Sequence, residues 1–298
     1  MNRQLVIPLN RRDFVAAGAG LLSATILPMA DGGESKRPLF QFALVSDTHL
    51  GRRGDRESNL MATAVGEINR SRAAFTLFCG DLVDHGENAE NEGRYPEWLR
   101  IAGRLKNPFH AIPGNHDPRE LLRKHLGKPT DVAFDHRRFR FVCFADAEPN
   151  PGHNGVVTEK QIAWIRSQVQ QASKKRKTVI LASHVTYHRN QHPDTGWWIK
   201  KGHQELGVVL KSYRKTIAAF FSGHFHCGLR GWNDNFGIHE VVLPAVSWNR
   251  DRGLKKAPGF ALNDFRSGYV MADVFGDRMV LRYKPLGAEV RARRGFPI

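Results

Sequence analysis

Residues 77–84 have the sequence Leu-Phe-Cys-Gly-Asp-Leu-Val-Asp, an apolar run that stops at Gly80 and the carboxylate of Asp81. A run of this length, bounded by glycine and polar residues, is typical of a strand buried on both faces of an α/β sheet. Asp81 then lies at the carboxyl end of that strand, where open α/β sheets place their ligands and chemistry. One such carboxylate means little unless the pattern recurs.

The pattern recurs in four other apolar runs, each of which ends in residue types that bind metals. Residues 42–46 lead into Asp47-Thr48-His49, residues 109–113 into Gly114-Asn115-His116-Asp117, residues 179–183 into His184, and residues 218–222 into Gly223-His224-Phe225-His226. We therefore expect five strands whose carboxyl ends converge on one site.

Length and composition are those of one large α/β domain. The chain has 298 residues, of which 41% are hydrophobic and 25% are charged, and no second domain is needed. A net charge of +16 attracts anions such as phosphate esters, nucleic acids or acidic lipid faces. The basic residues are scattered along the chain, which favours a solvated basic surface and predicts no specific nucleic-acid partner.

The three cysteines do not form a disulfide framework. Cys79 and Cys143 lie in predicted strands and are expected to be small buried side chains. Cys227 directly follows His226. For this residue, the alternative to simple burial is that its thiol lies close to a metal ion bound by the neighbouring histidines.

The first 30 residues resemble a twin-arginine export signal. Arg11 and Arg12 precede an uncharged stretch, 14–30, which glycines and a proline interrupt and which is short for a membrane span. We expect a signal peptide at 1–30, a polar linker at 31–38 and a single domain at 39–298. The export machinery is then a partner, and the mature protein is periplasmic or extracellular with no stable membrane span. An N-terminal anchor or a buried helix is the alternative.

From residue 39 onward, predicted strands and helices alternate. The helices are expected at 58–72, 95–105, 118–126, 158–172 and 205–213, and the strands beyond the five runs at 132–135, 139–145, 237–243, 268–275 and 278–284. The first two of these strands look like a hairpin, and the last three look like antiparallel strands that close a second sheet. Thr158 to Gln161 has the form of a capping box.

Residues 186–202 form the longest stretch without a helical or strand pattern, and they directly follow His184. Long irregular loops beside a site are often binding loops or lids. Trp197 and Trp198 can stack on a base or cover a substrate, and the alternative is that they pack against the core.

Paired ligand types make a dinuclear metal site the best interpretation of the five clusters. In extended backbone, residues i and i+2 project to the same side, so Asp47 with His49 and His224 with His226 can each face one cavity. Aspartate and histidine together suit Fe, Mn or Zn, and a carboxylate can bridge two cations. A single buried histidine is usually a satisfied core residue, but five clusters at strand ends disfavour that explanation.

Together these motifs resemble the full motif set of the calcineurin-like metallophosphoesterases, from Asp47 to His226 and in family order. The resemblance implies a four-layer α/β/β/α sandwich. It also implies a first metal held by Asp47, His49, Asp81 and His226, and a second metal held by Asp81 as a bridge with Asn115, His184 and His224. His116, supported by Asp84, would face the scissile phosphate.

The implied chemistry is hydrolysis of a phosphoester P–O bond. The resemblance implies that two metal ions would activate a bridging hydroxide for attack on phosphorus, and that His116 would donate a hydrogen bond or proton to the leaving oxygen. Asp84 would keep the imidazole oriented and favour its charged form.

Asp84 also separates this chain from the purple acid phosphatases, which carry a tyrosine ligand at that position. The short chain looks more like the cyclic-nucleotide and glycerophosphodiester phosphodiesterase branch, which implies a small phosphodiester substrate. A phosphomonoesterase is the alternative, followed by a metal-bound binding protein without catalysis and a basic nucleic-acid binder. The loops at 52–56, 88–94 and 186–202 are expected to set specificity.

Overall fold

The computed structural model describes residues 37–189, 196–252, 259–262, 264–290 and 292–297. The predicted signal peptide and most of the predicted linker lie outside these residues. Within the described ranges, no helix has both the length and the apolar character needed to cross a membrane.

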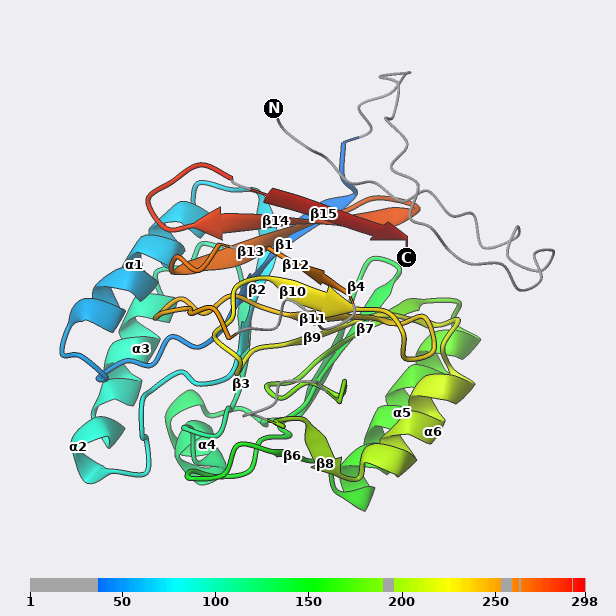
Figure 1. Ribbon diagram of the computed structural model, residues 1–298, viewed down its shortest axis with the longest axis horizontal. Coiled ribbons are helices and arrows are strands. Elements are labelled where there is room, and N and C mark those ends of the chain that lie inside the picture. Colours follow the sequence, from blue (N-terminus) through cyan, green and yellow to red (C-terminus); the bar gives the residue numbers. More distant parts are fainter. Residues whose placement is uncertain (1–36, 190–195, 253–258, 263, 291, 298) are drawn as a thin grey trace.

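The described residues form two mixed sheets that face each other (Figure 1). The first sheet has the strand order β15-β14-β13-β1-β2-β3. Its strands are β1 (Phe40–Val45), β2 (Ala73–Cys79), β3 (Phe109–Ile112), β13 (Gly268–Val274), β14 (Arg278–Pro285) and β15 (Ala292–Pro297). Strands β1, β2 and β3 are parallel to one another, while β13 pairs antiparallel with β1.

The second sheet has the strand order β12-β10-β11-β9-β7-β5-β4. Its strands are β4 (Val132–His136), β5 (Phe139–Cys143), β7 (Thr178–Ala182), β9 (Ile217–Ser222), β10 (Arg230–Trp232), β11 (His239–Val242) and β12 (Phe260–Ala261). The predicted hairpin is confirmed as β4 and β5. A small parallel pair, β6 (Gly155–Val156) and β8 (Ile199–Lys201), places a short strand in the stretch predicted as an irregular loop.

Helices cover the outer face of each sheet, which completes the predicted α/β/β/α sandwich (Figure 1). The helices are α1 (Arg56–Ile68), α2 (Ala89–Glu92), α3 (Arg94–Ala102), α4 (Arg119–Leu126), α5 (Glu159–Lys174) and α6 (His203–Ser212). Buried side chains of α1, α3 and α4 pack on the first sheet, and those of α5 and α6 pack on the second.

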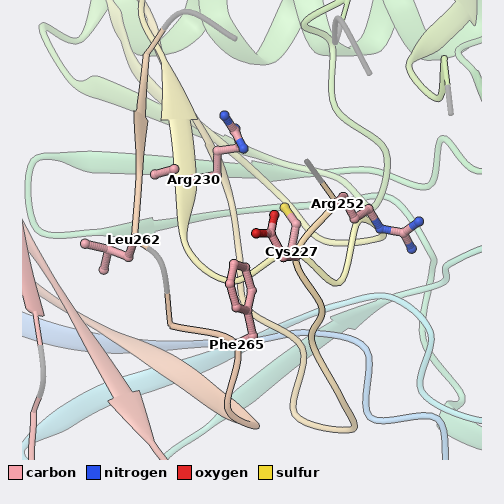
Figure 2. Close-up of a pocket in the computed structure, with 7 residues that line it drawn as sticks. Cys227, Arg230, Arg252, Leu262 and Phe265 are labelled. Atoms are coloured by element: carbon pink, nitrogen blue, oxygen red, sulfur yellow. The ribbon is translucent and has the colours of Figure 1, made fainter. Parts of the chain in front are cut away.

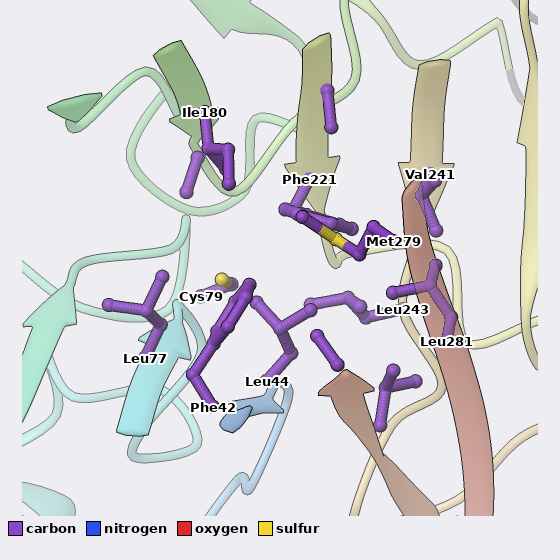
Figure 3. Close-up of a cluster of buried hydrophobic side chains, with 14 of the residues drawn as sticks. Phe42, Leu44, Leu77, Cys79, Ile180, Phe221, Val241, Leu243, Met279 and Leu281 are labelled. Atoms are coloured by element: carbon purple, nitrogen blue, oxygen red, sulfur yellow. The ribbon is translucent and has the colours of Figure 1, made fainter. Parts of the chain in front are cut away.

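The largest apolar cluster lies between the two sheets (Figure 3). Phe42, Leu44 and Leu77 of the first sheet meet Ile180 and Phe221 of the second. These residues come from the same apolar runs that end in the predicted ligands. The runs are therefore buried on both faces, between the facing sheet on one side and the helices on the other.

One expectation about the second sheet is wrong. The strands predicted at 237–243, 268–275 and 278–284 do not form one antiparallel sheet, because β11 pairs parallel with β9, whereas β13 and β14 extend the first sheet beside β1. The hydrophobic pattern of a strand shows which faces are buried but carries no information about its partner. Strand β10 pairs with the other edge of β11, so β11 lies between β9 and β10 inside the second sheet.

The predicted capping box at the start of α5 is confirmed. Thr158 Oγ1 accepts from the N–H of Gln161 at 3.3 Å, and the Gln161 side chain accepts from the N–H of Thr158 at 3.1 Å. This reciprocal pair satisfies two backbone donors that the first turn of a helix leaves without partners.

We expect Thr158→Ala to lower the free energy of unfolding by about 1 kcal/mol, because the N-terminal turn of α5 loses its cap. Urea unfolding of the metal-free protein measures this change. Thr158→Ser retains the hydroxyl oxygen and serves as the control. Equal stability of the alanine variant and the wild type would show that the cap contributes nothing measurable.

Candidate metal centre

The predicted site residues follow strands of both sheets. Asp47 and His49 come after β1, Asp81 and Asp84 after β2, Asn115 and His116 after β3, His184 after β7, and His224 and His226 after β9. His116 is half-buried and the other eight are buried. The five strand ends do converge, but they belong to two facing sheets.

Five of the predicted ligands have backbone in the left-handed conformation. The φ angles are 55° at Asp47, 46° at His49, 52° at Asp81, 73° at His224 and 48° at His226. The backbone of residues other than glycine rarely adopts these positive φ angles, and the residues that do so cluster at functional sites. Asp47 and His49 therefore share one cluster for a reason other than the expected one, since they lie beyond β1 with left-handed φ angles and not in extended backbone.

Two motif glycines make room for the ligands that pack against them. A Cβ atom at Gly114 would collide with the Asp81 carboxylate, and one at Gly223 would lie 2.6 Å from Asp47 Oδ2. Such contacts are too short for any side chain at these positions. The glycines thus allow the loops after β3 and β9 to approach the carboxylates that follow β1 and β2.

The first cluster of donor atoms contains Asp47, His49, Asp81 and His226. His226 Nε2 lies 3.1 Å from Asp47 Oδ1 and 3.1 Å from His49 Nε2. His49 Nε2 lies 3.2 Å from Asp81 Oδ2. One donor atom from each residue fits within 4.8 Å of all the others, as a single ion requires.

The second cluster contains Asp81, His184 and His224. His184 Nε2 lies 3.3 Å from Asp81 Oδ2 and 3.2 Å from His224 Nδ1. Asp81 Oδ2 thus takes part in both clusters, which is the geometry of a carboxylate that bridges two cations. The other oxygen, Asp81 Oδ1, accepts the N–H of His116 at 3.0 Å.

Partners outside the clusters fix which nitrogen each histidine turns inward. His49 Nδ1 lies 2.7 Å from the carboxylate oxygen Asp84 Oδ1. The other three histidines each contact a backbone carbonyl. The distances are 2.8 Å from His184 Nδ1 to Cys79, 2.8 Å from His226 Nδ1 to Trp248 and 2.9 Å from His224 Nε2 to His153. Because oxygen only accepts here, these nitrogens carry the proton. The opposite nitrogen of each ring faces the cluster, where it would give its lone pair to a bound metal ion in place of a proton, as in metal-binding histidines.

The spacing of the donors fits first-row metal ions. Ligands that each lie about 2.0–2.2 Å from one ion at tetrahedral or octahedral angles are roughly 3.0–3.5 Å apart. The donors of both clusters are nitrogen and oxygen atoms without a thiolate, which suits Fe, Mn or Zn. Asn115 adds a further acceptor, since its buried Oδ1 has no hydrogen-bond partner.

The buried carboxylates of the clusters attract positive charge. Burial opposes the charged form of Asp47, but His226 and His184 outweigh it and lower the pKa of Asp47 to about 2. Burial likewise opposes the charged form of His184, but Asp81 outweighs it and raises the pKa of His184 to about 10. The carboxylates therefore stay ionised and hold positive charge in the space between them.

Asp84 contacts His49 more closely than it contacts His116. Asp84 Oδ1 lies 2.7 Å from His49 Nδ1 and 3.4 Å from His116 Nδ1. The backbone N–H of His85 donates to His116 Nδ1 at 3.1 Å, so this nitrogen is an acceptor. Burial lowers the pKa of His116 to about 4, although Asp81 and Asp84 both favour the charged ring, so the ring is neutral near pH 7.

Two buried carboxylates to which the sequence analysis assigned no role hold the loops of the site. Asp117 accepts the backbone N–H groups of Leu82, Val83 and Gly114, and Asp146 accepts those of His184 and Val185. Asp146 directly follows the apolar run of β5, so the recurring pattern of an apolar run and a carboxylate was present there too. At this position the pattern marks a residue that orients the loop carrying the ligand His184.

The two predicted tryptophans have different surroundings. The Trp197 ring stacks on His153 at 4.5 Å, and the guanidinium of Arg252 lies 4.9 Å from its centre. Trp198 contacts His203 and lies under Arg189. Packing beside the site therefore describes Trp197 better than a free stacking platform does. Part of the 186–202 loop, residues 190–195, lies outside the described residues.

Trp248 is a neighbour of the first cluster that no motif indicated. Its ring stacks on His226 at 4.0 Å, and the Arg52 guanidinium lies 4.1 Å from its centre. Arg52 also donates to Asp84 Oδ1 at 3.3 Å. The predicted specificity loop at 52–56 thus reaches the metal centre through Arg52.

Cys227 belongs to a separate pocket and not to the donor clusters. Figure 2 shows its sulfur in a pocket lined by Arg230, Arg252, Leu262 and Phe265. Among the described residues, neither donor cluster includes it. Burial raises the pKa of the Cys227 thiol to about 12, so the free thiol stays protonated.

The chain resembles known proteins in sequence and in fold. It is 26% identical over 252 residues to a probable cyclic nucleotide phosphodiesterase of Rhodopseudomonas palustris, an alignment that covers 74% of this chain and 86% of that protein. It is 28% identical over 287 residues to a cAMP/cGMP dual specificity phosphodiesterase of Mycobacterium tuberculosis, with 85% and 82% covered. A solved dimetal phosphatase from Danio rerio shares the fold, with a TM-score of 0.68 at 17% identity over 87% of this chain and 99% of that one.

A family model decides the classification. The model of the calcineurin-like phosphoesterases matches residues 40–228, which is well over half of the chain and includes every residue of both donor clusters. The family that the motifs resemble is therefore the family of this protein: the chain belongs to the calcineurin-like phosphoesterases, and its clusters of histidine and aspartate form the metal site of a metallophosphoesterase.

Proposed function

We propose that this protein is a phosphodiesterase that uses two metal ions, Fe, Mn or Zn, to hydrolyse a small phosphodiester. The observation that carries the proposal is the position of Asp81 Oδ2, 3.2 Å from His49 Nε2 and 3.3 Å from His184 Nε2. A shared oxygen between two donor clusters supports a pair of ions. The two phosphodiesterases similar to this chain support a diester substrate.

Asp47, His49, Asp81 and His226 would hold one ion, and Asp81, Asn115, His184 and His224 the other. When bound, such a pair of ions lowers the pKa of a water molecule and neutralises charge on the phosphoryl oxygens. The outer partners of the four histidines keep their lone pairs directed at these positions.

His116 is suited to assist the leaving group. Its Nδ1 accepts the N–H of His85, so the neutral ring carries its proton on Nε2. A neutral imidazole with a proton on Nε2 can donate a hydrogen bond to the oxygen that leaves the phosphorus atom. The N–H of His116, held by Asp81 Oδ1, fixes the position of its backbone relative to the bridging carboxylate. Asp84 then mainly orients the ring of His49, whose Nδ1 lies 2.7 Å from Asp84 Oδ1.

A comparison of two chromogenic substrates tests the proposal. We expect protein reconstituted with Mn²⁺ to hydrolyse bis(4-nitrophenyl) phosphate at least ten times more efficiently, in kcat/KM, than 4-nitrophenyl phosphate. Metal-free protein should hydrolyse neither. A preference for the monoester would establish the phosphatase alternative, and the absence of metal-dependent turnover of both would favour a binding protein. A positive result directs the next assay to cAMP, cGMP and glycerophosphodiesters.

Two substitutions separate metal binding from leaving-group assistance. Asp81→Asn removes the bridging charge, and we expect it to reduce bound metal from two ions to one or none. His116→Ala should keep both ions and lower kcat by about 10²–10⁴-fold, the usual contribution of a general acid. Inductively coupled plasma mass spectrometry counts the ions, and the diester assay gives kcat. Asp277→Asn, at a carboxylate that is 75% exposed, is the control for Asp81→Asn.

These variants can contradict the assigned roles. Two tightly bound ions in Asp81→Asn would remove the bridging role of this carboxylate. Wild-type turnover in His116→Ala would remove the role of His116, whatever the metal content.

We also propose that residues 1–30 direct export through the twin-arginine route, which the adjacent Arg11 and Arg12 and the weakly apolar stretch after them support. Replacing both arginines by lysine should leave the protein in the cytoplasmic fraction of a bacterial host that has this route. The unchanged sequence should reach the periplasmic or extracellular fraction. The same distribution for both proteins would contradict the proposal.

A further inference from the structure

Asn150 is a residue beside the metal centre to which the motifs assign no role. It lies in the loop between β5 and β6, and so comes from the second sheet, whereas Asn115 follows β3 of the first sheet. Its backbone N–H donates to the Asn115 carbonyl at 2.9 Å. This main-chain bond holds the two loops together and brings the two asparagine side chains into contact.

The side-chain amide of Asn150 contacts four groups. Its Oδ1 accepts from Asn115 Nδ2 at 3.2 Å. Its Nδ2 lies 3.2 Å from Glu87 Oε1, 2.8 Å from His85 Nδ1 and 3.4 Å from His116 Nδ1. The amide therefore connects an acidic residue at the rim of the site to a predicted metal ligand and to the ring beside the phosphate position.

Glu87 determines which way this amide points. An ionised carboxylate only accepts hydrogen bonds, whereas an asparagine amide has one donating and one accepting end. Burial raises the pKa of Glu87, but hydrogen bonds, among them one to its own backbone N–H and one from Asn150, outweigh it and keep the pKa below its usual value. The NH₂ group of Asn150 must then face Glu87, and its oxygen must face Asn115.

The same reasoning fixes the amide of Asn115. Because Asn150 presents an oxygen, Asn115 must turn its NH₂ group toward it. The oxygen of Asn115 is then left on the other side, where it is buried and has no hydrogen-bond partner. Burying a hydrogen-bond acceptor without a partner costs free energy of folding unless the acceptor contacts a cation or a hydrogen-bond donor.

We propose that Asn150, oriented by Glu87, is a positioning residue that turns the Asn115 oxygen toward the second metal ion. This inference rests on the proposed two-metal site and adds residues that lie outside its ligand set. In the opposite orientation, Asn115 would present its NH₂ group to the cation. The relay from Glu87 through Asn150 to Asn115 thus selects the amide orientation that can bind metal.

The test is a titration of the metal-free, full-length protein with Mn²⁺, in which electron paramagnetic resonance measures the free ion. We expect two ions to bind the wild type. In Asn150→Ala, the second ion should bind about 10–100-fold more weakly, as is usual when an outer partner of a ligand is lost. The first ion should bind as in the wild type, because Asn150 contacts none of the donors of the first cluster.

Glu87→Gln tests the origin of the orientation. Glutamine can offer either an acceptor or a donor to Asn150, so we expect a weaker second ion here too, by several-fold. Glu205→Gln removes the same charge from an exposed residue of α6, outside the three predicted specificity loops, and is the matched control. The Glu87 side chain is 37% exposed, so this variant carries the test if Asn150→Ala does not fold.

A rescue experiment separates positioning from a general structural role. If Asn150 acts through the metal, excess Mn²⁺ should restore the kcat of Asn150→Ala toward that of the wild type. A variant that binds both ions within twofold of the wild type would overturn the inference, as would a loss of kcat that excess Mn²⁺ does not restore. Fewer than two ions in the wild type would instead overturn the two-metal site itself, and this inference with it.

Discussion

The carboxylate of Asp81 is the group on which both donor clusters depend. It is fully enclosed, and its Oδ2 lies next to a histidine nitrogen of each cluster. Opposing histidines hold the pKa of Asp81 well below its usual value although burial would raise it. A buried charge of this kind persists only where cations or strong donors surround it. The left-handed turns and the close glycines near it all serve to bring those partners within reach.

The motif residues could be predicted because each belongs to a local pattern, an apolar run followed by donor types. This pattern gave the donors of both clusters, and it selected Asn115, whose buried oxygen remains without a partner. The same pattern at Asp146 was overlooked, since no second ligand type follows it. Sequence also could not assign β11 to the second sheet, because burial patterns do not reveal the neighbouring strand.

The outer partners of the ligands were out of reach of sequence reasoning for a different reason. Asn150 lies 35 positions from Asn115 along the chain, and the carbonyl of Trp248 lies 22 positions from His226. Backbone carbonyls carry no identity that a sequence displays, and a single asparagine in a loop has no periodicity. Only the packing of two loops from different sheets shows that these groups determine which atom a ligand presents.

The division of the ligands between two sheets makes the inter-sheet core part of the catalytic apparatus. Phe42 and Phe221 meet in that core, five residues before Asp47 and three residues before His224 respectively. Close-packed interiors transmit small displacements because they contain little free volume. A side chain lost at the centre of the sandwich would let one sheet settle against the other and would move the two halves of each donor cluster relative to one another. The geometry of the donor clusters therefore depends also on apolar residues of the core, through the alignment of the two layers.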